Sequence, residues 1–237
     1  MNMKISLIHG QNHKGSTYAA SRMLAEKIGG EISEFFLPKD FCEQCLGCLT
    51  CLNMGIEFCP HYGALNQLLS AMLNADVIII DSPTYCLEMT GQLKSLFDHL
   101  FTAWLSHRPN EAMFTKTGVA VSTAAGMGMN SVTKSIAKQM FYLGIPKIYR
   151  MSQRVAATSW ETVAEKTKMK IEADVNKIAS RIRNKNGKAK PGFKLKFMFS
   201  VMRSMQKNND YAPLDKQHWE EKNWLKKARP WKNTSAF

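Results

Sequence analysis

Short apolar runs alternate with segments of helical length along most of the chain, and this alternation limits the fold more than any other feature. Val77-Ile78-Ile79-Ile80 is continuous and β-branched, which is typical of a strand buried on both faces of a parallel sheet. Further strands are predicted at Lys4–His9, Glu31–Leu37, Gly118–Val121 and Lys147–Met151. Helices are predicted at Ser16–Ile28, Leu65–Leu73, Leu93–Leu105, Asn130–Leu143 and Trp160–Ile182.

Strands that alternate with helices in this way predict right-handed βαβ units and therefore an α/β fold. Five strands favour an open parallel sheet in the order 2-1-3-4-5, with helices on both faces, over a six-stranded dinucleotide-binding sheet. In that order the ligand crevice lies at the carboxyl ends of strands 1 and 3. The loops that follow the strands are therefore where a ligand is expected.

Positive charge is concentrated in the C-terminal part of the chain. The 237 residues carry a formal net charge of +13. Residues 187–237 hold twelve Lys and Arg against four Asp and Glu, which is +8 and leaves +5 for the other 186 residues. We therefore expect an α/β domain over residues 1–186, with a Cys-rich insert at 41–61, and a basic helical extension over 187–237.

The distribution of apolar residues and cysteines indicates a cellular location. No apolar run approaches the ~18 residues of a membrane-spanning helix, and the N-terminal residues have no signal-peptide pattern. Five of the six cysteines crowd into residues 42–59, whereas a secreted disulfide framework spreads its bridges along the chain. These features predict a cytoplasmic protein with reduced thiols.

The loop after the first predicted strand has the composition of a phosphate site. Residues 10–17 read Gly-Gln-Asn-His-Lys-Gly-Ser-Thr and lead directly into a helix. Free amides, hydroxyls and the positive end of the helix dipole favour a phosphate there. A plain helix cap at Ser16 or Thr17 is the simpler alternative. Neither a dinucleotide fingerprint nor a nucleotide P-loop is present in the sequence.

Two further loops follow adjacent strands of the predicted sheet. Ser82-Pro83-Thr84-Tyr85 follows the third strand; Pro83 stiffens this loop, and Tyr85 packs either on a planar ligand or in the core. Thr123-Ala124-Ala125-Gly126 follows the fourth strand, and its small residues permit a flat ligand to approach closely. Three such loops at one edge indicate a ligand site more strongly than any one of them.

These loops, together with the segment Thr90–His99, resemble those of the NADPH-dependent FMN reductases of the flavodoxin superfamily. More narrowly, the chain is similar to the cysteine-containing branch that includes the iron–sulfur flavoproteins. The resemblance covers about residues 4–150 and implies a flavodoxin-like fold that binds FMN. It implies that the phosphate contacts Asn12, Lys14, Ser16 and Thr17, and that the ring contacts Ser82, Pro83, Thr84, Tyr85, Thr123, Ala124, Ala125 and Gly126.

The resemblance also implies an enzyme that takes hydride from NADH or NADPH and reduces a quinone, a nitro compound, a ferric complex or a protein. No catalytic residue is assigned, because the flavin supplies the hydride chemistry. A first alternative is an electron carrier without a nicotinamide site, although the positive charge disfavours it. A second is a basic membrane- or nucleic-acid-binding module on the same scaffold. We expect a homodimer, no nucleic-acid partner and no membrane span.

The cysteines have the spacing of a metal site. Cys45-x2-Cys48-x2-Cys51 followed by Cys59-Pro60 is similar to ferredoxin ligand runs and to the run of the iron–sulfur flavoproteins. We predict Cys45, Cys48, Cys51 and Cys59 as ligands, with Cys42 and Cys86 outside the set. Three states remain open: a [4Fe-4S] cluster, unmetallated thiols, and zinc with His61 as a nitrogen ligand.

The C-terminal extension is both basic and apolar. A helix near residues 193–203 is expected to bury Phe193, Phe197 and Val201 against its own domain or a second subunit, rather than to lie on anionic lipid. The three tryptophans at 219, 224 and 231 lie among lysines, as in a nucleic-acid stacking surface. Docking on the body of the protein is the preferred interpretation for them as well.

Overall fold

The computed structural model describes residues 2–232, and its centre is a five-stranded parallel sheet. The strands are β1 (Lys4–His9), β2 (Glu31–Phe36), β3 (Val77–Asp81), β4 (Thr117–Ala124) and β5 (Lys147–Arg154), in the order β2-β1-β3-β4-β5. Every residue of β3 and β4 is buried, as the apolar run at 77–80 predicts. The predicted flavodoxin-like α/β fold is confirmed.

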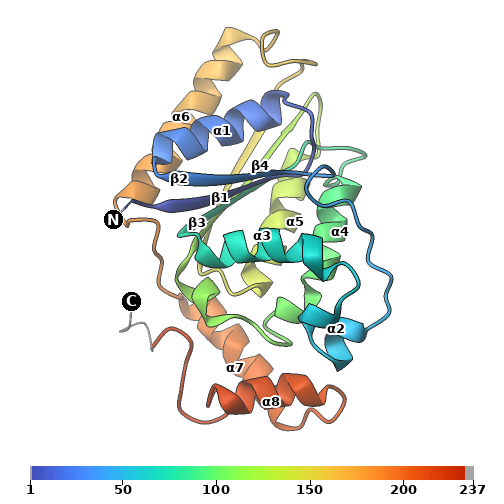
Figure 1. The fold of residues 1–237 in the computed structure, drawn as a ribbon. Helices are drawn as coiled ribbons and strands as arrows, with labels where there is room; N and C mark the ends of the chain where they lie inside the picture. The colour runs from blue at the N-terminus through green and yellow to red at the C-terminus, as the bar shows by residue number, and fades with distance from the viewer. Residues whose placement is uncertain (1, 233–237) are drawn as a thin grey trace.

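Helices cover both faces of the sheet (Figure 1). On one face lie α1 (Ser16–Ile28) and α6 (Glu165–Arg183), which pack on one hydrophobic cluster. On the other lie α3 (Tyr62–Asn74), α4 (Gly91–His99) and α5 (Met129–Tyr142), which share a second cluster. The Cys-rich segment contains α2 (Thr50–Asn53) and the 3-10 helix η1 (Ile56–Phe58).

Two predicted helices begin or end elsewhere. The helix expected at Leu93–Leu105 ends at His99. Beyond it, the Leu105 N–H donates to the carbonyl of Tyr142 at 2.7 Å, so this residue bonds to the end of α5 instead of continuing a helix. The helix expected from Trp160 begins at Glu165. Residues 160–163 form a turn instead, with Val163 buried in the core. Two further 3-10 helices, η2 (Phe101–Ala103) and η3 (Glu111–Thr115), connect α4 to β4.

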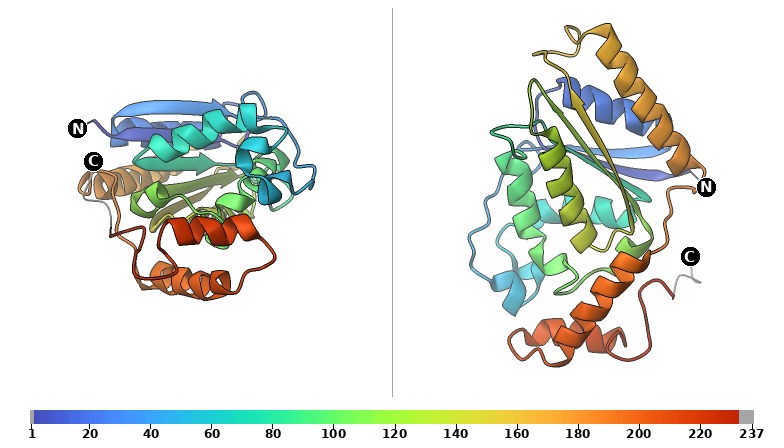
Figure 2. Two further views of the ribbon diagram at one scale, coloured as in Figure 1. Left: turned by 60° about the horizontal axis from the view of Figure 1, so that its bottom comes forward. Right: turned by 180° about the vertical axis from the view of Figure 1, so that it is seen from behind.

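The C-terminal extension folds back on the body through α7 (Phe193–Lys207) and α8 (Pro213–Glu221), away from the sheet (Figure 2). Its core joins the body residues Leu105 and Phe114 to four residues of the extension, namely Leu195, Phe199, Trp219 and Trp224. Trp219 Nε1–H donates to the carbonyl of His107 at 2.6 Å. Trp219 and Trp224 therefore dock the extension on the body, which is the interpretation preferred from the sequence. The final residues, 233–237, lie outside the described part.

Of the two alternatives predicted for Phe193, Phe197 and Val201 on α7, burial against the domain is wrong, and burial against a second subunit stays a prediction. Phe193, Phe197 and Val201 are exposed instead of buried against the domain, with Phe193 at 84% and Phe197 at 57% of full accessibility. The opposite side of the helix is buried, because Leu195 and Phe199 pack against the tryptophans on and just after α8.

Within residues 2–232, no helix combines the length and apolar character needed to cross a bilayer.

Candidate functional site

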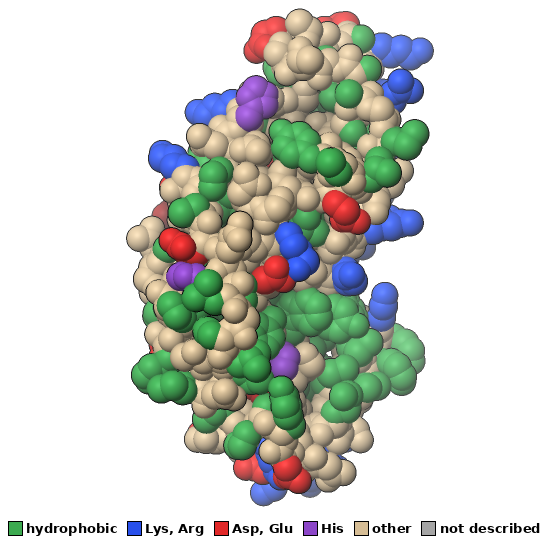
Figure 3. Space-filling model, turned by 90° about the vertical axis from the view of Figure 1, so that its right-hand side faces the viewer, with side chains coloured by type: hydrophobic (Ala, Val, Ile, Leu, Met, Phe, Trp, Pro, Cys, Tyr) green, Lys and Arg blue, Asp and Glu red, His purple; other side chains and the backbone are tan. Residues whose placement is uncertain are grey.

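The carboxyl ends of β1, β3 and β4 meet at one edge of the sheet, where the chain order changes direction between β1 and β3. The loops that leave these strands lie on the right-hand side of Figure 1, above the Cys-rich segment, and this side faces the viewer in Figure 3. Hydrophobic side chains, with cysteine coloured among them, gather over the lower half of this view. The predicted ligand loops and the cysteines thus occupy one side of the protein.

The first loop ends at the N-terminus of α1, which has no side-chain cap. Ser16 and Thr17 are buried there, and the Ser16 hydroxyl has no hydrogen-bond partner within the described protein. A buried, unpartnered hydroxyl is rare, and it stands beside first-turn amides that have no intrahelical acceptor. The residues present fit a phosphate group, which supplies acceptor oxygens at a helix N-terminus.

The two other residues expected at the phosphate lie on the surface of this loop. Asn12 is exposed, and its backbone amide donates to the side chain of Gln11 at 2.8 Å. The Lys14 ammonium lies over the rings of Tyr18 and Phe36, with centroid distances of 5.4 and 5.5 Å. Lys14 thus lies beside the first turn of α1, and it is in none of the ion pairs among the described residues.

The second loop extends β3 along the end of β4. The amides of Ser82 and Thr84 donate to the carbonyls of Val121 and Thr123, both at 3.1 Å. The buried Ser82 hydroxyl accepts from the amide of Thr90, the N-cap of α4, at 3.0 Å. Pro83 and Thr84 are half-buried, whereas Tyr85 is exposed. Ser82 thus shapes the loop, and Tyr85 is the side chain that it presents outward.

The third loop contacts both others. Thr123 Oγ1 lies 2.7 Å from Thr17 Oγ1, so a hydrogen bond joins the third loop to the first. Gly128 has a φ of +95°, and a Cβ there would lie 2.7 Å from Cγ2 of Thr84, so glycine permits the second and third loops to touch. Ala124 is buried, while Ala125 and Gly126 are exposed. The structure therefore brings the three predicted loops together.

A buried histidine lies beneath these loops, and sequence reasoning missed it. His9 and Asp81 end β1 and β3 in register, with His9 Nδ1 2.5 Å from Asp81 Oδ2 and His9 Nε2 3.0 Å from Glu34 Oε1. Burial lowers the pKa of His9, but the bonds and charges of Asp81 and Glu34 outweigh it and raise the pKa above 6.5. Only the register of β1 against β3, which pairs His9 with Asp81, could have predicted this contact.

The four predicted metal ligands line one pocket. Cys45, Cys48, Cys51 and Cys59 surround it, and Cys42 is not among its lining residues. Burial raises the pKa of the Cys51 thiol, and the negative charges of Cys59, Cys45 and Cys48 raise it further. In contrast, hydrogen bonds from Thr50 lower the pKa of Cys48. Four cysteines around one pocket form a ligand set that suits a metal centre.

The positions of the cysteine sulfurs can be compared with those of a four-thiolate zinc site. In a tetrahedral Zn(Cys)4 site, Zn–S bonds of about 2.3 Å place the sulfurs about 3.8 Å apart. Within the described chain, the one group of three metal-type ligands that lie within 4.8 Å of one another is Cys59, His61 and His99, so no three cysteine sulfurs are this close. The described cysteines therefore do not form a ready four-thiolate zinc site.

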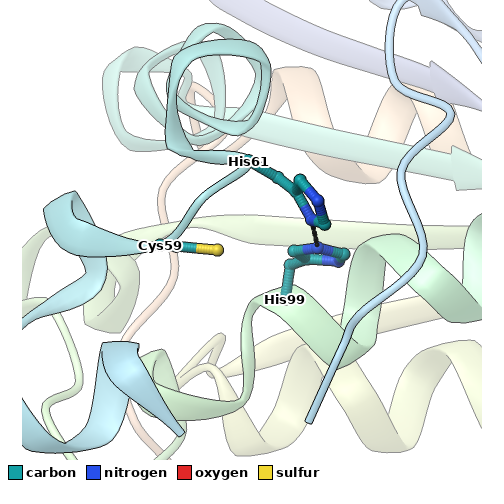
Figure 4. Close-up of side chains that lie close together, drawn as sticks. All are labelled: Cys59, His61 and His99. Carbon is teal, nitrogen blue, oxygen red and sulfur yellow. Dashed lines mark hydrogen bonds between the residues drawn. The ribbon is translucent and has the colours of Figure 1, made fainter. Parts of the chain in front are cut away.

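Two histidines close the pocket on the α4 side (Figure 4). His61 Nδ1 lies 2.9 Å from His99 Nε2, and the His99 Nδ1–H donates to the carbonyl of Ser95 at 2.8 Å. Cys59 points toward this pair. His61 was predicted as an alternative ligand from its place after Cys59-Pro60. His99 was not, because α4, 38 residues further along the chain, brings it there.

The Cys-rich segment is tied to the body near its start and in its middle. Ser95 Oγ–H donates to the carbonyl of Glu43 at 2.6 Å, which attaches the segment to α4. Arg108 donates to the carbonyls of Cys51 at 2.5 Å and Leu52 at 3.3 Å. Because α4 begins beside the second loop and ends at the cysteine pocket, one nine-residue helix separates the two sites. All six cysteines are free thiols.

Comparisons with known proteins agree with this geometry. The family model described as NADPH-dependent FMN reductase matches residues 3–161. An iron–sulfur flavoprotein of Methanosarcina thermophila is 29% identical over 149 residues, which cover 60% of this chain and 75% of that protein. One of Archaeoglobus fulgidus is 32% identical over 99 residues, which cover 40% of this chain and 48% of that protein.

Solved structures are similar in fold. A flavone reductase aligns with a TM-score of 0.59 and 15% identity, covering 80% of this chain and 66% of its own. An azoreductase from Bacillus anthracis str. Sterne aligns with a TM-score of 0.57 and 12% identity, covering 77% of this chain and 99% of its own. At these identities the likeness concerns the fold alone.

Proposed function

The chain belongs to the NADPH-dependent FMN reductase family, and from this premise we propose that it is an FMN-dependent oxidoreductase that takes hydride from NADH or NADPH and reduces a separate acceptor. The observation that carries the proposal is the buried, unpartnered hydroxyl of Ser16 at the uncapped start of α1. A group that brings acceptor oxygens to this point is expected, and a terminal phosphate does so.

The residues proposed to hold FMN come from the three loops. Ser16, Thr17 and the α1 amides hold the phosphate, with Asn12 and Lys14 at its outer side. The ring would be held by Pro83, Thr84, Tyr85, Thr123, Ala124, Ala125 and Gly126, while the buried Ser82 would act through the shape of the second loop. When bound, FMN supplies hydride transfer and electron storage. The protein orients it: the Thr17–Thr123 bond holds the phosphate loop and the ring loop at a constant separation.

We further propose that Cys45, Cys48, Cys51 and Cys59 hold a [4Fe-4S] cluster. Their common pocket and their free thiols support this, as does the similarity to proteins named iron–sulfur flavoproteins. A cluster, when bound, supplies one-electron transfer. Zinc at Cys59, His61 and His99 is the second candidate, favoured by the convergence of those three ligand atoms within 4.8 Å.

Other parts of the proposal concern context. A homodimer in the cytoplasm, where thiols stay reduced, is proposed, with residues 1–186 as the flavin domain and 187–237 as its basic extension. The acceptor is one of the classes named above: a quinone, a nitro compound, a ferric complex or a protein.

Anaerobic mixing of the purified protein with NADH or NADPH separates the enzyme from its main alternative. An enzyme with a nicotinamide site loses its oxidised-flavin absorbance within seconds, and the absorbance returns when an acceptor is added. A flavin that stays oxidised in excess NADH and NADPH, yet is reduced by dithionite, would identify an electron carrier instead.

A further inference from the structure

We propose that the outward face of α7 docks on the surface of an anionic lipid bilayer. The proposal concerns a peripheral contact parallel to the bilayer surface. It is independent of the flavin and of the cysteine centre.

The first observation is that α7 has two apolar faces, only one of which the protein covers. Leu195 and Phe199 are buried in the core of the extension. Met198 and Met202 pack against the same core. Four further apolar residues recur every four positions at Phe193, Phe197, Val201 and Met205, and all four are exposed. Residues four apart lie on one side of a helix, so they form a continuous stripe along three turns.

The stripe has the side chains of an interfacial helix. The rings of Phe193 and Phe197 are stacked, with centroids 6.2 Å apart, and form an aromatic ridge at the N-terminal end of the helix. Exposed apolar side chains in such a row are unusual on a surface that faces only water. An aromatic ridge with aliphatic residues behind it is suited to the boundary between lipid head groups and acyl chains.

Charge complementarity identifies the occupant. Residues 187–209 contain Lys188, Lys190, Lys194, Lys196, Arg203 and Lys207, and no Asp or Glu. Lys194 and Arg203 contact the rest of the protein, at the Phe141 ring and the Lys226 carbonyl, whereas the four other lysines are exposed. Exposed lysines on a helix with an outward apolar stripe match a bilayer that contains anionic lipids, because the charges attract the head groups while the apolar groups enter the interface.

The same charges disfavour the other occupants. A second copy placed symmetrically would bring two acid-free basic helices face to face, so their charges would repel. A nucleic acid complements the charge, and it could stack bases on Phe193 and Phe197, but it offers nothing to Val201 and Met205 further along the stripe. A lipid surface satisfies the charged and the apolar residues together.

The test is flotation of the full-length protein with phosphatidylcholine vesicles, with and without phosphatidylglycerol, at low and high salt. We expect binding only to the anionic vesicles, weakened by salt. Phe193→Ser combined with Phe197→Ser should lower the partition coefficient about tenfold or more, since both apolar side chains are then lost from the interface. Met169→Ser on α6 is the matched control, because Met169 is also an exposed apolar residue, and it should bind as the native protein does.

Three results would overturn the proposal. One is an absence of binding to anionic vesicles at low salt. Another is equal binding of the native protein and the double serine variant, which would mean that positive charge alone holds the protein on the vesicles. The third is a native dimer that becomes monomeric in the same variant by light scattering, which would assign the stripe to a second copy. Circular dichroism checks that the variant stays folded.

Discussion

Arg108 and Asp215 form an ion pair that joins the C-terminal extension to the backbone of the Cys-rich segment. Asp215 lies on α8 and is buried, and its second carboxylate oxygen lies 2.7 Å from His107 Nδ1. The same guanidinium donates to the carbonyl of Cys51 at 2.5 Å. The extension therefore supports the cysteine pocket through one arginine, although no residue of α7 or α8 lines that pocket.

Replacing Asp215 by Asn should destabilise the protein and loosen the cysteine pocket. Removing one partner of a buried pair leaves the other charge uncompensated, at a cost of about 3 kcal/mol. Urea unfolding measures the loss, and metal retention in the presence of a chelator measures the effect on the pocket. Asp210→Asn is the control, since Asp210 is exposed and its 3.5 Å contact with Lys216 contributes little. Equal stability of D215N and D210N would contradict this role.

Replacing Ser16 and Thr17 together by Ala should weaken FMN binding. Hydrogen bonds to a charged phosphate contribute about 1–3 kcal/mol, which corresponds to a roughly 5- to 150-fold higher dissociation constant. Fluorescence quenching of FMN by apo-protein measures it. Ser204→Ala, at an exposed position on α7, should leave the affinity unchanged. If the double variant binds as tightly as S204A, the phosphate lies elsewhere.

Cys45→Ser and Cys42→Ser should differ in metal content. Both thiols are exposed, but only Cys45 lines the pocket. After anaerobic purification, C45S should lose most of its iron and sulfide, while C42S keeps the native amounts. Native protein with neither iron nor zinc, and with flavin reduction intact, would mean that the cysteines are not a metal site.

The buried His9 predicts a dependence of stability on pH. Its folded pKa is raised above 6.5, so the folded state binds the proton more tightly than the unfolded state. The stabilisation is fully present below pH 6.5 and is lost as the pH rises through the folded pKa. The native protein should therefore lose free energy of unfolding relative to His9→Gln as the pH increases. Urea unfolding of both proteins at pH 6 and at higher pH measures this. If the difference in free energy of unfolding between the native protein and the variant is the same at both pH values, His9 does not titrate in this way.

The sequence predicted the sheet well because β3 is a nearly pure β-branched run and the other strands are short apolar runs between helical segments. The loops at the strand ends were predictable once the strand order was known. Each of the three loops, and the run of pocket cysteines, is local in sequence. The contacts that sequence reasoning missed are long-range: His99 reaches the pocket through α4, Asp215 reaches Arg108 from 107 residues away, and His9 meets Asp81 through strand register. The sequence did not show which side of α7 packs on the domain, because a helix that is apolar on two sides does not reveal which side is buried.

The identity of the flavin tests the central claim most directly. The protein is purified under argon, the flavin is released by denaturation, and the extract is resolved by chromatography and quantified per chain. The account predicts FMN, close to one per chain after reconstitution of the apo-protein, and no FAD. Recovery of FAD, or apo-protein that fails to bind added FMN, would contradict a phosphate site built from Ser16, Thr17 and the N-terminus of α1.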